Sequence, residues 1–184
     1  MQSEKLIQSL IEQSRQTINR AEKLKALDMP SLTWREAPES WNILECLEHL
    51  NLYGDFYLPQ MEQKIKQATR QTEPEWKSGW LGNYFANSML PKEKLNKMKT
   101  FSDKNPLNTH LDKTVIDRFI NQQIKLLELL NQAGNVSLNQ VKISTSISSL
   151  LKLKLGDTLL FYTNHTLRHL QQIERIQAHQ PIVR

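Results

Sequence analysis

Apolar residues recur at intervals of three and four along most of the chain, which is the spacing of an amphipathic α-helix. In the N-terminal part this apolar stripe consists of Ile7, Leu10, Ile11, Ile18, Ala21 and Leu24. The pattern stops before a stretch that is broken by Pro30 and Pro38. We therefore predict a first helix from about Glu4 to about Leu27.

A second helix has a readable start at Asn42. Glu45 follows three residues later, and this spacing is a capping box, in which each side chain binds a backbone N–H at the start of the helix. The inward stripe that follows consists of Ile43, Leu47, Leu50, Met61 and Ile65. Pro59 removes one backbone hydrogen bond, so we expect a bend there and a continuation to about Thr69.

A third helix is predicted in the second half of the chain. It begins after Asp112 or Thr114 and ends at Gly134, a residue type that favours a left-handed helix cap. Its apolar positions are Val115, Phe119, Ile120, Leu126, Leu127 and Leu130.

The region between residues 135 and 155 has a different period. Apolar and β-branched residues alternate there, at Val141, Ile143, Thr145 and Ile147, which indicates an extended chain. Because no partner strand is evident, we expect a lone extended segment and no sheet. A last helix then opens between Leu155 and Asp157, whose acid favours a first turn, and runs to about Ala178.

The connection between the second and third helices, from Gln71 to Pro106, loses this period and is rich in aromatic residues. These include Trp76, Trp80, Tyr84 and Phe85. Aromatic side chains at this density need burial, so we predict an ordered crossover with a short helix from about Leu81 to Met89. The expected fold class is all-α: a four-helix bundle with a long ordered crossover, forming a single domain over residues 1–184.

Composition agrees with a globular chain and excludes several classes. Of the 184 residues, 39 % are hydrophobic and 23 % are charged, and there are 5 Gly, 7 Pro and one Cys, which excludes collagen-like and disulfide-rich proteins. No apolar run approaches the ~20 residues that span a bilayer. The first residues also differ from a secretory signal. We expect a cytoplasmic protein without a membrane partner.

The net charge of +5 leaves nucleic acid open as a partner. Basic residues gather in the crossover at Lys92, Lys94, Lys97, Lys99 and Lys104. No base-stacking motif or recognition helix accompanies them, so we interpret them as a solvated loop face and expect no nucleic-acid partner.

Three histidines are candidates for chemistry. His165 and His169 are four residues apart on the predicted last helix, where both side chains point the same way and can hold one ion. Two of five histidines can share this spacing by chance. His49 lies at the flank of the second helix's inward stripe, and the alternative for it is a core-edge histidine bonded to a carbonyl. Cys46, one turn earlier, is more typical of a small buried residue than of a ligand or nucleophile.

Two stretches of sequence resemble the paired motifs of the DinB/YfiT-like superfamily. They are PESWNILECLEHL, which contains His49, and KLGDTLLFYTNHTLRHLQQIERI, which contains His165 and His169. The connection WKSGWLGNYFANSMLPKEKLNKMKTF also resembles a subgroup of that superfamily, so the likeness covers nearly the whole chain.

The resemblance implies a homodimeric four-helix bundle whose three histidines bind a divalent metal ion. The family's ligand on the second helix falls on His49, and its two ligands on the last helix fall on His165 and His169. Three neutral imidazoles leave a coordination position open, as in catalytic sites. Imidazole suits Zn, Ni, Cu and Fe, and we expect Zn or Ni.

The family includes thiol transferases and metal-dependent hydrolases. We therefore hold two hypotheses. The first is an enzyme that activates a low-molecular-weight thiol or water for attack on a small electrophile, with thiol transfer slightly favoured. The second is a non-catalytic protein that binds a metal or ligand as a stress-response accessory. Glu45, Tyr162 and Gln172 lie one turn from a ligand and are candidates to orient its ring, and no residue is assigned as a general acid or base.

Overall fold

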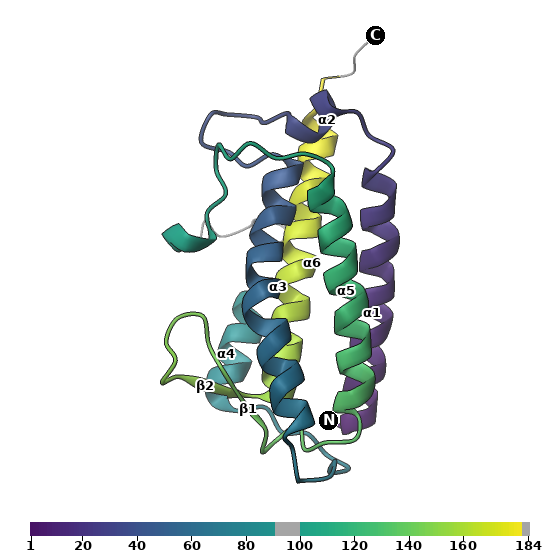
Figure 1. The fold of residues 1–184 in the computed structure, drawn as a ribbon, viewed down its shortest axis with the longest axis vertical. Coiled ribbons are helices and arrows are strands. Elements are labelled where there is room, and N and C mark those ends of the chain that lie inside the picture. The colour runs from purple at the N-terminus through teal and green to yellow at the C-terminus, as the bar shows by residue number, and fades with distance from the viewer. Residues whose placement is uncertain (91–99, 182–184) are drawn as a thin grey trace.

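Four long helices form the body of the protein in the computed structural model, which describes residues 1–90 and 100–181. They are α1 (Ser3–Leu24), α3 (Ile43–Lys66), α5 (Thr114–Ala133) and α6 (Leu155–His179). Helices α1 and α3 each pack against both α5 and α6, so the four lie side by side (Figure 1). The chain is mostly helical, which broadly confirms the all-α class.

The apolar stripes of the four helices meet in two clusters of buried side chains. One lies toward the end of the molecule where α3 ends, and includes Leu10, Tyr57, Met61, Leu126 and Tyr162. The other lies where α3 begins, and includes Ala21, Leu47, Ile116, Phe119 and Leu170. Burial of this apolar surface is the main force that holds the helices together.

The predicted start of α3 is confirmed. The Asn42 side chain accepts from the Glu45 N–H at 2.9 Å, and Glu45 Oε2 accepts from the Asn42 N–H at 2.9 Å. The helix continues through Pro59 and ends at Lys66, slightly before the predicted end. The bend at Pro59 stays a prediction.

The end of α5 differs from the prediction in conformation. The helix ends at Ala133 and Gly134 follows it, but Gly134 has φ −59°, which is right-handed. The N–H of Gly134 still bonds to the carbonyl of Leu130, at 3.2 Å, so the chain leaves the helix by continuing its turn. The left-handed cap was therefore wrong.

The expectation of a lone extended segment is also wrong. Strand β1 (Lys142–Ser144) pairs with strand β2 (Lys152–Lys154) in an antiparallel two-stranded sheet, with Ile143 opposite Leu153. The partner strand comes from the same segment and is three residues long, too short to show a period of its own. A short helix, α2 (Met29–Thr33), has no counterpart among the predicted elements. Pro30 interrupts the apolar pattern of the sequence, but proline suits the first turn of a helix that Asp28 caps.

The crossover contains the predicted short helix, α4 (Trp80–Ser88), followed by a short 3₁₀ turn at Ser102–Lys104. Its aromatic residues are only partly buried. Trp76 is 5 % exposed, but Trp80 is 84 % and Tyr84 is 65 % exposed. The prediction that these aromatic side chains are buried is therefore wrong for Trp80 and Tyr84. Helix α4 lies against the outer side of α6, and only one of its faces is covered (Figure 1).

Two residues in the first turn of α6 explain how the crossover is fixed. Asp157 is buried and accepts hydrogen bonds from Ser78 Oγ at 2.6 Å and from the Gly79 N–H at 3.1 Å, directly before α4. The Trp76 ring lies so close to Gly156 that a Cβ there would be 2.3 Å from Trp76 Nε1. This contact requires glycine.

The remaining sequence predictions concern the basic residues of the crossover and membrane-spanning helices. Lys92, Lys94, Lys97 and Lys99 lie outside the described residues, and Lys104 pairs with Asp103 at 3.1 Å. Within the described parts of the chain, every helix is too short or too polar to cross a membrane.

Candidate metal centre

The three histidines singled out by the sequence converge in the structure. His49 comes from α3, and His165 and His169 come from successive turns of α6. His165 Nε2 lies 3.1 Å from His49 Nε2 and 3.1 Å from His169 Nε2. All three side chains are buried, with 3 %, 4 % and 8 % of His49, His165 and His169 exposed. Among the described residues, they form the one group of three or more His, Cys, Asp or Glu with ligand atoms this close together.

Hydrogen bonds at the opposite ring nitrogens orient two of these histidines. His49 Nδ1 lies 2.7 Å from the backbone carbonyl oxygen of Lys104, and His169 Nδ1 lies 2.9 Å from Gln172 Oε1. A carbonyl oxygen only accepts, so each Nδ1 carries the proton and donates it. In a neutral ring the other nitrogen then has a free electron pair, and both Nε2 atoms present this pair to His165.

The proton count at the centre of the trio cannot satisfy all three nitrogens. His165 Nε2 carries at most one proton, which can be donated to His49 or to His169 but not to both. In at least one of the two pairs, therefore, the two Nε2 atoms face each other without a proton between them. In addition, His165 Nδ1 is buried and has no hydrogen-bond partner among the described residues. A cation bound between the three Nε2 atoms removes this repulsion.

The distances also suit a shared ion. Zinc–nitrogen bonds are ~2.0–2.1 Å long, so two nitrogens on one ion lie no more than about 4.2 Å apart. Both separations of 3.1 Å satisfy this condition. The residues present therefore fit a divalent ion in residue type, distance and protonation.

Burial keeps the three rings neutral, which is the form that binds metal. Desolvation lowers the pKa of His49 to about 4 and the pKa of His169 to about 3. Burial, together with the two neighbouring histidines, holds the pKa of His165 well below its usual range. All three are thus neutral near pH 7, before any ion is bound.

Among the candidates for orienting the rings, Gln172 does bond to a histidine, whereas Glu45 and Tyr162 bind elsewhere. Glu45 is completely buried and accepts from Arg35 Nη2 at 2.9 Å and from the Asn108 N–H at 2.6 Å. Tyr162 packs in the core against Tyr57. Cys46 is also buried in the core, and burial raises the pKa of its thiol.

Glu45 nevertheless acts on the centre indirectly, through the segment 104–108. This segment supplies the Lys104 carbonyl that holds His49, and it is tied down at Asn108 by Glu45 and at Asn105 by the Trp41 indole N–H, 3.0 Å from Asn105 Oδ1. Sequence reasoning missed the Lys104 contact. A backbone carbonyl is available at every residue, so no side-chain pattern marks the one that is used.

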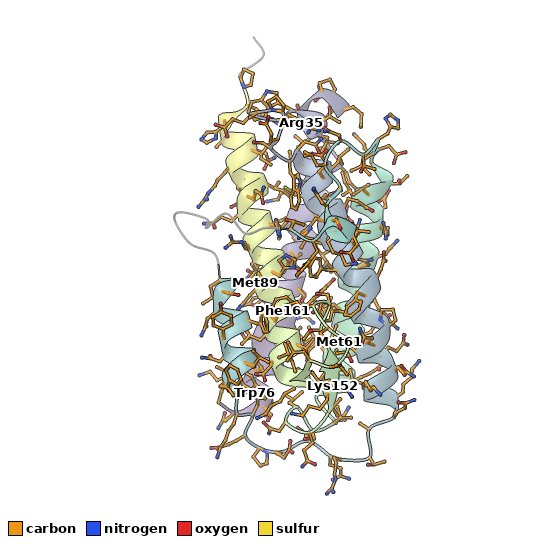
Figure 2. All side chains as sticks on the ribbon, turned by 90° about the vertical axis from the view of Figure 1, so that its left-hand side faces the viewer. Arg35, Met61, Trp76, Met89, Lys152 and Phe161 are labelled. Atoms are coloured by element: carbon orange, nitrogen blue, oxygen red, sulfur yellow. The ribbon has the colours of Figure 1, made fainter. Side chains whose placement is uncertain are left out.

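A pocket of about 920 Å³ opens directly on the trio. Its lining includes all three histidines and the aromatic residues Trp41, Tyr53, Tyr57, Tyr84, Phe85, Phe101 and Phe161. Phe161 on α6 and Met89 after α4, both lining residues, are labelled in Figure 2. Trp76 and Trp80 are not in this lining, whereas Trp41 is.

Comparison with known proteins gives one clear match. A family model described as the DinB superfamily matches residues 10–173, a range that contains all three histidines. No curated protein and no solved structure matches the chain significantly.

Proposed function

This chain belongs to the DinB superfamily, and we propose that it is a metal-dependent enzyme whose divalent ion is bound by His49, His165 and His169. The observation that carries the proposal is the facing set of three Nε2 atoms, which have too few protons to satisfy one another. A cation would relieve the repulsion between the facing electron pairs of this buried cluster, and neutral imidazole is a common ligand of divalent zinc and nickel.

We propose activation of a thiol or of water as the chemistry, with thiol transfer favoured over hydrolysis. When bound, the ion supplies Lewis acidity and lowers the pKa of a thiol or water at an open position. Open positions follow from a set of three protein ligands beside a pocket. Among the described lining residues the only carboxylate is Glu39, which is exposed, so this part of the chain offers no buried carboxylate base beside the trio.

The chain's own residues orient the histidines and shield them from solvent. The Lys104 carbonyl and Gln172 fix two imidazole rings in the tautomer that presents Nε2. The Trp41 ring covers His49 and His169, with centroids 4.7 and 5.8 Å away, and Tyr53 meets His165 edge-on at 4.6 Å. These rings exclude bulk water on two sides and leave the pocket as the approach.

The wider architecture is proposed on the same basis. The pairwise packing of α1, α3, α5 and α6 supports a four-helix bundle that forms a single domain. The homodimer and the cytoplasmic location that the sequence suggested stay predictions. A non-catalytic metal-binding or ligand-binding role is the alternative outcome of the test that follows.

The test is metal analysis of the purified protein combined with a substrate panel. We expect a divalent ion in the wild-type protein, and loss of this ion and of activity in His165→Ala, because that ring faces both other ligands. His110→Ala is the matched control: His110 is exposed in a loop and should change neither property. The panel should contain thiol-conjugation electrophiles and hydrolysable esters and amides.

Each result has a definite meaning. Wild-type metal content in His165→Ala, or full activity in metal-free protein, would overturn the metal-dependent proposal. Metal bound in the wild type without turnover of any panel substrate would favour the accessory role over the enzyme.

A further inference from the structure

We infer, building on the proposed function, that the pocket takes a small molecule with two parts: an anionic donor group that reaches the histidines and a flat apolar body that lies along an aromatic wall. The donor group would compensate the positive charge of the ion. The apolar body would be complementary to the wall in shape and polarity.

The aromatic wall runs without interruption from the buried histidines to the surface. The Phe161 ring stacks on His165, with centroids 5.9 Å apart and planes 18° apart. Phe85 follows, 6.3 Å from Phe161, and Tyr84 lies 5.7 Å from Phe85. The wall therefore begins at His165 on α6 and ends at Tyr84 on α4, which is 65 % exposed to solvent. Such a surface favours a flat apolar body over a strongly hydrated one.

Two further apolar side chains, Trp41 and Ile147, line the pocket. Trp41 lies against the histidines, and Ile147, in the turn between β1 and β2, lines the mouth and is 50 % exposed. Figure 1 shows the β1–β2 hairpin and α4 on the same side of the long helices. Both elements contribute apolar side chains to the lining, so a ligand in the pocket meets α4 and the hairpin.

The charge of the lining explains why the donor group is anionic. Three neutral imidazoles carry no charge to balance the double charge of a divalent ion. Among the described residues that line the pocket, the one carboxylate is that of Glu39, which is exposed. In a partly desolvated site an anionic donor such as a thiolate or hydroxamate compensates this charge.

The experiment compares two probes that share a donor group and differ in their body. Benzohydroxamate and acetohydroxamate are titrated by calorimetry into zinc-loaded and chelator-treated protein, so the readout is a dissociation constant and not activity. We expect the phenyl probe to bind zinc-loaded protein at least about tenfold more tightly than the methyl probe, because the wall removes its ring from water. Chelator treatment should weaken both.

Two failures are distinguishable. Equal dissociation constants for the two probes, with binding that still depends on zinc, would overturn the aromatic-wall inference and leave the metal proposal standing. Binding of neither probe above the level of the metal-free protein would overturn the metal proposal itself.

A pair of phenylalanine variants tests the wall directly. Phe85 and Phe56 are both half-buried and pack against the same core cluster, but only Phe85 lines the pocket. Phe85→Ala should reduce the preference for the phenyl probe several-fold, and Phe56→Ala should leave it unchanged. An equal effect of both variants would show that the preference does not come from the wall.

A second pair lies on the surface, where substitution leaves the core intact. Ile147 and Leu150 share the turn between β1 and β2 and are 50 % and 92 % exposed, and only Ile147 lines the pocket. Ile147→Asp should weaken phenyl-probe binding to zinc-loaded protein, because a carboxylate at the mouth opposes both the anion and its apolar body. Leu150→Asp should not, and identical constants for the two variants would contradict the inference.

Discussion

At the scale of single residues, the candidate centre depends on what holds each imidazole as much as on the imidazoles themselves. His49 is oriented by a backbone carbonyl and His169 by the Gln172 side chain, while His165 Nδ1 has no partner among the described residues. His165 lies between the other two and is therefore positioned by packing against Phe161 and Tyr53. Each ring thus has its own physical constraint.

Gln172 gives a residue-scale prediction, because its side chain, from outside the trio, bonds to a histidine of the trio. Gln172→Leu removes the acceptor of His169 Nδ1–H and should weaken zinc binding by about 10-fold to 100-fold. Gln177→Leu, at an exposed position on the same helix, is the control. Competition with a chromophoric chelator measures the affinity. An affinity equal to that of the wild type in Gln172→Leu would show that the contact does not orient the ligand.

Cys46 illustrates a residue whose chemistry the fold suppresses. It lies one turn before His49, but its side chain is completely buried in the apolar cluster near the start of α3. Burial raises the pKa of its thiol, so the reactive thiolate is disfavoured. The structure therefore assigns Cys46 to the core and leaves the pocket to the histidines.

At the scale of elements, the first turn of α6 fixes the crossover. Asp157 accepts hydrogen bonds from Ser78 and Gly79 directly before α4, and Gly156 leaves room for the Trp76 ring, so two adjacent residues of α6 fix the stretch from Trp76 to Gly79, which is distant in the sequence. The same helix carries His165 and His169 two to three turns later. The position of the pocket wall on α4 is thereby tied to the position of the ligands.

Gly156→Ala tests this close contact. The new Cβ would lie 2.3 Å from Trp76 Nε1 and 2.6 Å from Trp76 Cδ1, so the buried ring must move, and we expect about 1–3 kcal/mol of destabilisation. Gly54→Ala is the control. The three atoms nearest to its Cβ belong to the end of the flexible Gln122 side chain, which can rotate away with loss of its hydrogen bonds to Asn51 and Asp55, so we expect a smaller destabilisation than in Gly156→Ala. Urea unfolding measures both, and an unchanged free energy of unfolding in Gly156→Ala would contradict the packing described here.

At the scale of the whole molecule, the fold and the candidate metal centre use different side chains. The two apolar clusters join all four long helices, and neither contains a histidine. The trio joins α3 to α6 at a site open to the pocket. An ion would therefore add stability to a molecule that its core already holds together.

Metal removal is the corresponding prediction. Chelator-treated protein should keep its far-ultraviolet circular dichroism spectrum at 25 °C, because the apolar core does not need the ion. Zinc at a free concentration of about 100 times its dissociation constant should raise the free energy of unfolding by about 2.7 kcal/mol, and with it the melting temperature. Loss of the helical signal on chelation would contradict the first expectation, that the core holds the fold without the ion. A melting temperature that does not change with zinc would contradict the second, that zinc binds the folded protein.

The sequence by itself determined the features that depend on local spacing. The period of apolar residues predicted the four long helices, and Asn42 with Glu45 predicted the start of α3. The spacing of His165 and His169 placed both on one face of α6. These inferences succeed because helix period and capping depend on residues within one or two turns.

Only the tertiary structure decided the features that depend on distant contacts. The pairing of β1 with β2, the exposure of Trp80 and the choice of Trp41 for the pocket wall follow from how elements pack, which no local pattern records. The same holds for the Lys104 carbonyl on His49, fifty-five residues away. Resemblance pointed to the three histidines, but their facing nitrogens, and the shortage of protons between them, appear only when α3 and α6 lie side by side.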